Sequence, residues 1–149
     1  MISRRCFAVA ALGVVSLFAD IALSAGGAET FKARLTALPA DARTRPSLAG
    51  IGNATATLSG SKLTITGSFD GLLSPATMAQ LHSAVAAGVR GPVIGDLMIS
   101  KATSGSFSGT FDLNSQQMES LSKGGLYIQI HSEKAPDGVI WGWLIKEAR

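Results

Sequence analysis

The amino-acid sequence predicts an all-β domain, an antiparallel Greek-key β-sandwich of about seven or eight strands with one short helix near residues 114–123. After residue 30, short runs rich in Val, Ile, Thr and Ser are broken by turn residues about every ten positions. Within these runs apolar and polar residues alternate, as is typical of strands with one buried face. At 149 residues, the chain fits a single domain.

The first 28 residues have the layout of a secretory signal peptide. Arg4 and Arg5 precede an apolar run, residues 7–19, that is too short to span a bilayer as a helix. Small residues follow, and we expect cleavage after Ala28, which leaves residues 29–149 as the mature domain. The arginine pair also fits a twin-arginine signal, so both export routes stay open. The sequence therefore predicts an exported protein, either periplasmic or extracellular.

The composition argues against several classes of protein. Cys6 is the only cysteine and lies in the predicted signal peptide, so the mature chain can form no internal disulfide. The formal net charge of +3 is small and partly belongs to the signal peptide, so we expect no nucleic-acid partner. The predicted mature chain contains no apolar stretch long enough for a transmembrane helix.

The first half of the predicted domain consists of an opening strand and a hairpin. In "FKARLTAL", Phe31, Ala33 and Leu35 share one face and charged or hydroxyl residues occupy the other. The following "PADARTRPS" contains two prolines and several charges, which indicates a loop. Next, "GNATATLSGSKLTITGSFDGL" predicts two strands joined by the turn "SGSK".

The second half predicts further strands around the one helix. "SPATMAQLHSAVAAGVRGPVIGDLMIS" contains a strand with His82, a Gly-rich loop at residues 88–92 and a strand from Val93; "GSFSGTFDL" is another strand. "NSQQMESLSKGG" predicts the helix, with Asn114 or Ser115 as its N-cap and a glycine pair at its end. "LYIQIHS" and "VIWGWLI" form a final hairpin across "EKAPDG".

The order of "GLSPAT", "QLHSAVAAGVRGPVIGDL", "LYIQIHS" and "APDGVIWGWL" resembles the CHRD domain, which takes its name from chordin and occurs in many secreted bacterial proteins. The resemblance covers residues 31 to about 144 and implies an exported β-sandwich, usually without assigned enzymatic activity. His82 and His131 match the family pattern, whereas Gln80 stands in the place of a further histidine. Three more departures replace the family's Glu, Arg and Gln: Val139, Trp141 and Trp143. These departures weaken the transfer of a charged or metal-binding role.

The two histidines are the candidate metal ligands. By strand alternation His82 shares a face with Gln80, and His131 shares a face with Gln129. If the two strands are neighbours in one sheet, these four side chains form one polar patch. Imidazole with carboxylate suits copper or zinc, although tight sites usually have three or four protein ligands. The candidate helpers are Gln80, Asp96, Glu133 and Asp137.

The alternative interpretation is that both histidines are ordinary solvent-facing or hydrogen-bonded strand residues. Cu/Zn superoxide dismutase shares the sandwich architecture, but that type of enzyme needs more histidines than the two present. No segment has the order of a nucleotide-binding loop or of a nucleophile elbow. The sequence therefore requires no cofactor and shows no catalytic signature.

The tryptophan strand "VIWGWLI" is apolar on both faces, so it is either covered on both sides or presents an aromatic surface. In the second case the candidate contact residues are Trp141 and Trp143, together with Arg90 from the Gly-rich loop. We favour an exported binding or structural module for an unidentified protein or glycan. The alternative is a copper- or zinc-binding carrier or metalloenzyme that uses His82 and His131.

Overall fold

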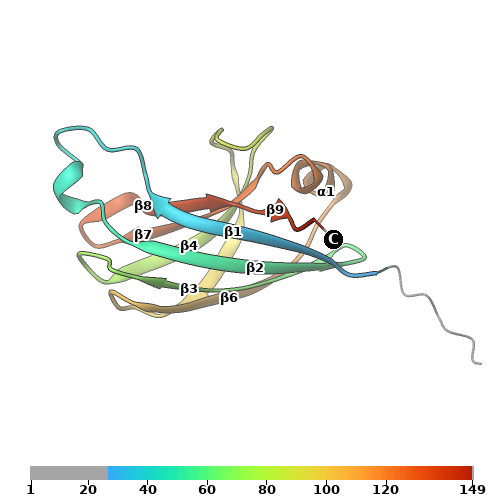
Figure 1. Ribbon diagram of the computed structural model, residues 1–149, viewed down its shortest axis with the longest axis horizontal. Coiled ribbons are helices and arrows are strands. Elements are labelled where there is room, and N and C mark those ends of the chain that lie inside the picture. The colour runs from blue at the N-terminus through green and yellow to red at the C-terminus, as the bar shows by residue number, and fades with distance from the viewer. Residues whose placement is uncertain (1–26, 149) are drawn as a thin grey trace, which may run out of the picture.

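The computed structural model describes residues 27–148, so almost all of the predicted signal peptide lies outside the described residues (Figure 1). The strands follow in the order β1 (Glu29–Ala37), β2 (Ile51–Ser59), β3 (Lys62–Asp70), β4 (Ala76–Ser83), β5 (Val93–Ile99), β6 (Gly105–Asp112), β7 (Leu126–Ser132), β8 (Ala135–Trp143) and β9 (Ile145–Lys146). A short 3₁₀ turn, Arg45–Ser47, interrupts the loop after β1. The α-helix α1 (Ser115–Ser122) lies between β6 and β7.

The eight long strands form one closed antiparallel barrel. Its order is β1–β2–β3–β6–β5–β4–β7–β8, and β8 then pairs with β1. β1 closes the barrel because it pairs with β2 over residues 29–36, while Thr36 and Ala37 also pair with Trp141 and Ile140 of β8. The short β9 pairs with the first half of β1. Figure 1 shows β1 and β2 running side by side across the length of the barrel.

The all-β class and the single short helix are confirmed, but the predicted Greek-key sandwich is replaced by a barrel. Alternation of apolar and polar residues is the same in both architectures, because each has one buried face per strand. Closure depends on β1 pairing not only with β2, the next strand in the chain, but also with β8, which lies near the other end of the domain. The local alternation of apolar and polar residues therefore does not predict this pairing.

The interior is filled by the inward side chains of all the long strands. Phe31, Ala33 and Leu35 face inward from β1, which confirms the alternation expected for the opening strand. The largest fully buried aliphatic side chains of the core include Leu63, Ile65, Leu81, Ile128, Ile130 and Ile140. Eight strands leave an interior just wide enough for side chains to fill it. The candidate functional residues therefore lie on the outside of the barrel wall or in its loops.

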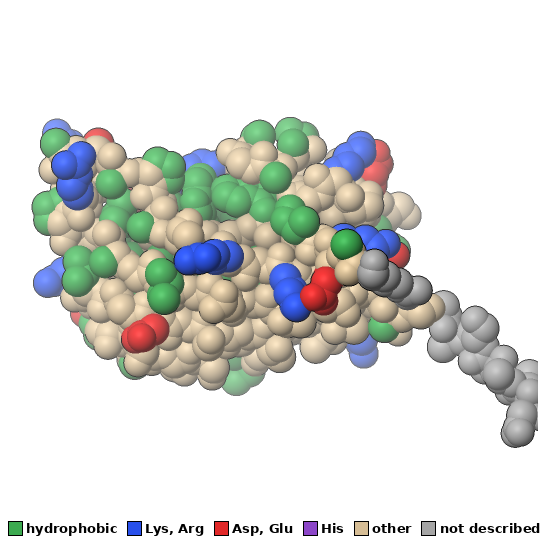
Figure 2. All heavy atoms as spheres, viewed as in Figure 1, with side chains coloured by type: hydrophobic (Ala, Val, Ile, Leu, Met, Phe, Trp, Pro, Cys, Tyr) green, Lys and Arg blue, Asp and Glu red, His purple; other side chains and the backbone are tan. Residues whose placement is uncertain are grey.

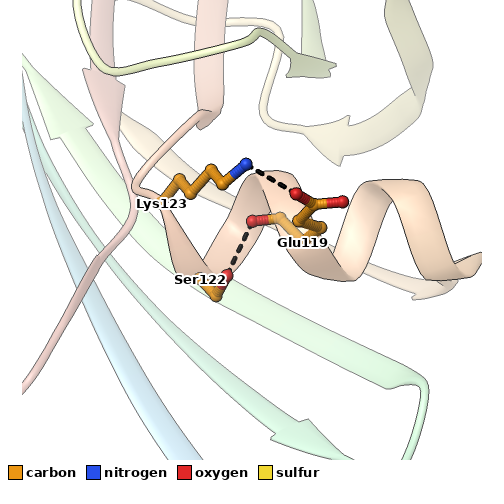
Figure 3. Close-up of polar contacts among 3 residues, drawn as sticks. All are labelled: Glu119, Ser122 and Lys123. Atoms are coloured by element: carbon orange, nitrogen blue, oxygen red, sulfur yellow. Dashed lines mark hydrogen bonds and ion pairs between the residues drawn. The ribbon is translucent and has the colours of Figure 1, made fainter.

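The helix α1 begins with a capping box. The Asn114 side chain accepts from the Gln117 backbone N–H, and the Gln117 side chain accepts from the Asn114 N–H, so Asn114 and not Ser115 is the N-cap. Figure 3 shows the ion pair between Lys123 and Glu119, which lowers the pKa of the Glu119 carboxyl. Within the described part of the chain, no helix is long and apolar enough to cross a membrane.

Candidate functional site

The outer face of β4, β7 and β8 brings the candidate residues into two rows. β4 and β7 are antiparallel neighbours, as the polar-patch hypothesis required. In one row His82 lies opposite Tyr127, which lies opposite Trp143. In the next row Gln80 lies opposite Gln129, which lies opposite Trp141. One histidine, one tyrosine, two amides and both tryptophans thus share one face of the barrel.

His82 is buried on this outer face, with 8% of its surface exposed. Its Nδ1 lies 3.0 Å from the Gly91 carbonyl oxygen, and its ring stacks on Tyr127 with 4.6 Å between centroids and 12° between planes. Because a carbonyl can only accept, Nδ1 carries the proton, and the buried Nε2 lone pair has no protein partner. Burial lowers the pKa of His82, and the nearby charges of His131 and Arg90 lower it further, against the opposing effect of the Gly91 hydrogen bond.

His131 is held by the first residues of β8. Its Nδ1 lies 2.7 Å from the Pro136 carbonyl oxygen, so this nitrogen is the donor and Nε2 accepts from the Gln129 amide. That Nε2 lies 3.4 Å from Nε2 of Gln129, which donates a hydrogen bond of 3.0 Å to the Asp137 carbonyl. The two side chains together stabilise the irregular start of β8, where the β7–β8 register shifts.

The two histidines lie on one face, but they are not opposite each other. His131 pairs with Met78, whereas His82 pairs with Tyr127, so the two imidazoles are four positions apart along the strands. At about 3.3 Å per residue, the Cα atoms of the two histidines are offset by roughly 13 Å along the strand direction. The pair formed by Gln80 and Gln129 lies between them.

The candidate metal helpers are distributed around this face. The Gln80 side chain donates to the Asp96 carboxylate over 2.9 Å. Glu133 and Asp137 are exposed where β7 turns into β8. Among residues 27–148 no group of three or more His, Cys, Asp or Glu side chains is placed to hold a metal ion.

Four rings form a cluster on the outer face, here called the aromatic cluster: His82, Tyr127, Trp141 and Trp143. The centroid of Tyr127 lies 6.0 Å from that of Trp141 and 5.2 Å from that of Trp143, and the two tryptophans are 4.7 Å apart. Both tryptophans are half-buried, so they are neither fully covered core residues nor fully exposed contact residues, the two alternatives that the sequence left open. The guanidinium carbon of Arg90 lies 5.1 Å from the centroid of Trp141, within the range of a cation–π contact.

The β4–β5 loop, residues 84–92, is fastened to the aromatic cluster at its base. The Gly91 N–H donates to the Tyr127 hydroxyl over 3.2 Å, and that hydroxyl lies 3.3 Å from the Gly91 carbonyl, which also accepts from His82. A Cβ on Gly91 would lie 1.9 Å from the Ser83 carbonyl oxygen, so only glycine fits this close approach. Sequence reasoning named Arg90 but missed Gly91 and Tyr127 as the residues that hold the loop.

The tip of the β4–β5 loop is apolar and exposed. Residues 84–89, "AVAAGV", contain no polar side chain, and Val85 and Val89 are 79% and 44% exposed. The loop projects from the barrel at the top of Figure 1. Figure 2 shows hydrophobic side chains at this tip and in the surface directly below it.

A groove of about 260 Å³ lies beside the loop base, between the loop that follows β1 and the turn before β8. Its lining includes Arg90, Lys134 and Asp137, together with apolar side chains such as Leu38 and Leu48. Arg90 therefore joins the groove to the aromatic cluster. Charged and apolar groups are both accessible around this end of the outer face.

The fold and this face define a small antiparallel β-barrel domain with an aromatic outer surface and an apolar loop anchored to it. The family model of the CHRD domain matches residues 31–144, and the chain belongs to that family. The match includes β4, β7 and β8, the strands that carry the aromatic cluster. No curated protein and no solved structure shows significant similarity to the chain.

Proposed function

We propose that the protein is an exported binding module, and that its contact surface consists of the β4–β5 loop, Arg90 and the two half-buried tryptophans, Trp141 and Trp143. The observation that carries this proposal is the exposed apolar loop tip held by three hydrogen-bond contacts at Gly91. A run of exposed apolar residues is unfavourable in water unless it serves an interaction. The partner is a protein or a glycan of the cell surface or periplasm.

The anchored loop base suits recognition, because a preorganised loop loses little conformational entropy when it binds. Gly91 is fixed to Tyr127 and His82, while Gly88 at the tip has a φ of +84° and open space around it. Large aromatic residues and arginine are enriched in binding hot spots, since they provide both apolar area and directed polar contacts. The anchored base thus holds the loop in position, and the exposed tip makes the contact with the partner.

The proposal is tested by binding of the fluorescently labelled mature protein, residues 29–149, to the surface of cells that produce it. We expect saturable binding that the double variant Val85→Ser, Val89→Ser abolishes, because both apolar contacts are lost. Thr57→Ser on the exposed face of β2 is the matched control, since it changes a surface strand residue far from the loop. Equal binding by wild type and the double variant contradicts the proposal.

A second candidate function, copper or zinc binding, is favoured by the protonation of the two histidines. His82 and His131 each place Nδ1 against a backbone carbonyl, so Nε2 carries the lone pair; that of His82 has no protein partner, and that of His131 accepts from Gln129. Metal-ligating histidines usually have this arrangement of ring nitrogens. The ligating atoms would be Nε2 of both residues, with Gln80, Glu133 or Asp137 as helpers.

Metal binding is tested by titration of the mature protein with copper or zinc, beside the double variant His82→Ala, His131→Ala. Stoichiometric binding that is lost in the double variant supports this second function and a rearrangement that brings the two imidazoles together. Unchanged fluorescence of the aromatic cluster at equimolar metal, with no bound ion by elemental analysis, contradicts it. Circular dichroism of the variant checks that it remains folded.

A further inference from the structure

The ladder between β5 and β6 is incomplete, unlike those on either side of it. β6 pairs with β3 at eight positions, from residues 62–69 of β3 to residues 105–112 of β6. β5 and β6 pair at only two, Met98 with Ser108 and Ile99 with Phe107. Within residues 93–97 of β5, Ile94 lies at a bulge and the others pair with β4 alone, and residues 109–112 of β6 pair with β3 alone. We call this opening in the barrel wall the seam.

The ring of Phe111 closes the seam from the core side. A Cβ added to Gly95 would lie 2.9 Å from this ring, and one added to Gly109 would lie 3.0 Å from it. The two glycines thus leave room for an aromatic ring between the separated strands. Phe111 packs against the hydrophobic core from this position. The partly buried ring therefore fills space between β5 and β6 where no ladder joins them.

The outside of the seam is a shallow depression of about 400 Å³. Its lining includes Thr64, Thr66, Asp96, Met98, Ser108 and Thr110. Met98 is 80% exposed, the highest value among the exposed large hydrophobic residues together with Val85 at 79%. Asp96 is the charged residue of this lining, and one of its carboxylate oxygens already accepts from Gln80.

We propose that the seam binds an extended polypeptide segment of a partner, which adds as a strand to the free edge of β5 and carries a basic side chain opposite Asp96. An unpaired strand edge presents alternating N–H and C=O groups, and another strand is the ligand that matches them. Met98 offers an apolar contact, and Asp96 offers a carboxylate that forms no ion pair with any of residues 27–148. This site lies outside the contact surface proposed above and does not depend on it.

A second copy of the chain fits the seam poorly. Across the described residues the other neighbouring long strands are joined by longer ladders, except β1 and β8, which also pair at only two positions; there the short β9 pairs with a further part of β1. Its own seam is one edge that a second copy could offer, and this edge is short, because it spans only residues 93–97 of β5. A flexible extended segment can enter this opening, whereas two rigid barrels can bring only a few backbone groups together.

The test uses the mature protein, residues 29–149, and a blocked heptapeptide of alternating Lys and Val. Amide hydrogen exchange is measured residue by residue with and without peptide. We expect the seam-facing amides of residues 93–97, those that donate no hydrogen bond to β4, to exchange faster than the amides of β3 when the protein is free, and to slow about tenfold on binding. Two control peptides are included: one with Glu in place of Lys, and one with N-methyl groups that remove the donors of one peptide edge.

Two variants locate the charge contribution. Asp96→Asn keeps an acceptor for Gln80 but removes the charge, and we expect it to weaken binding of the Lys–Val peptide by about fivefold at low salt. Glu119→Gln, which removes an exposed charge of α1, is the matched control and should leave binding unchanged.

Four results would overturn the proposal. The first is a set of seam amides that exchange as slowly as those of β3 in the free protein, because the edge would then already be satisfied. The second is failure of the Lys–Val peptide to slow exchange at residues 93–97. The third is equal binding of the Glu–Val or N-methyl peptide. The fourth is a concentration-dependent dimer that protects the seam, since the occupant would then be a second copy.

Discussion

The two sides of the barrel differ on their outer faces although their strands alternate in the same way. β2 alternates strictly between exposed and buried residues, and its outer side chains, such as Thr55 and Thr57, are small and polar. In β7 nearly every residue is buried, because on its outer face Tyr127 is covered by neighbouring rings and by the β4–β5 loop, and Gln129 lies against the first residues of β8. A strand that is buried on both faces thus shows where the outside of the barrel is covered, here by the aromatic cluster and the β4–β5 loop.

The largest expected difference between these two sides comes from truncation of the central ring. Tyr127→Ala should lower the free energy of unfolding by about 3–4 kcal/mol, because a buried aromatic is replaced by a cavity and its ring contacts are lost. Thr57→Ala on β2 should change it by less than about 0.5 kcal/mol. Urea denaturation measures both, and similar effects of the two changes would contradict the comparison.

Gly91→Ala should have the next largest effect. The added Cβ would meet the Ser83 backbone, so the loop base has to move away from Tyr127, at an expected loss of about 2 kcal/mol. Gly88→Ala, at the open loop tip, meets no neighbouring atom and should lose about 1 kcal/mol through its positive φ. Thermal unfolding of the two variants compares them; a larger loss for Gly88→Ala would argue against the anchored base.

Tyr127→Phe isolates the hydroxyl from the ring. The variant retains the packing but removes the contacts with Gly91, and we expect a loss of about 1 kcal/mol. The exchange rate of the Gly91 amide should rise by more than the change in global stability explains. An unchanged rate would show that the hydroxyl does not hold the loop.

The smallest expected effect is a dependence of stability on pH that arises from His82. Burial holds its pKa below the ordinary value of 6.5, so the unfolded chain binds the proton more readily than the folded one. The stability due to neutral His82 is therefore complete above that value and is lost as the pH falls below it towards the lowered pKa. His82→Gln should flatten the curve of unfolding free energy against pH in this range, and an unchanged slope would contradict the assignment.

Several features could be predicted because they depend on local sequence. Alternation identified the inward side chains of β1, the glycine pair and Asn114 located the helix, and parity placed His82 and His131 on comparable faces of their strands. Local signals also located the Gly-rich loop near Arg90. These features depend only on residues close together in the sequence, so they are the same whichever strands pair with one another.

Other features depend on contacts between distant residues and could not be predicted. Closure of the barrel needs β1 between β2 and β8, and the offset of the two histidines follows from the β4–β7 register. The covering of Tyr127 requires Gly91, which is 36 positions away, to return over β7. The apolar segment "VIWGWLI" was compatible with a buried strand and with an aromatic surface. How far its tryptophans are covered depends on the β4–β5 loop, whose Arg90 lies over Trp141.

The central claim, that the anchored loop is the contact surface, is tested most directly by a photoreactive amino acid placed at Val85 of the exported protein in the cells that produce it. We expect one dominant crosslinked product. This product should be absent when the same photoreactive group is placed at Thr57, on the exposed polar face of β2. We also expect Gly91→Ala to weaken the crosslink. Equal crosslinking from both positions, or none from Val85, would contradict the account.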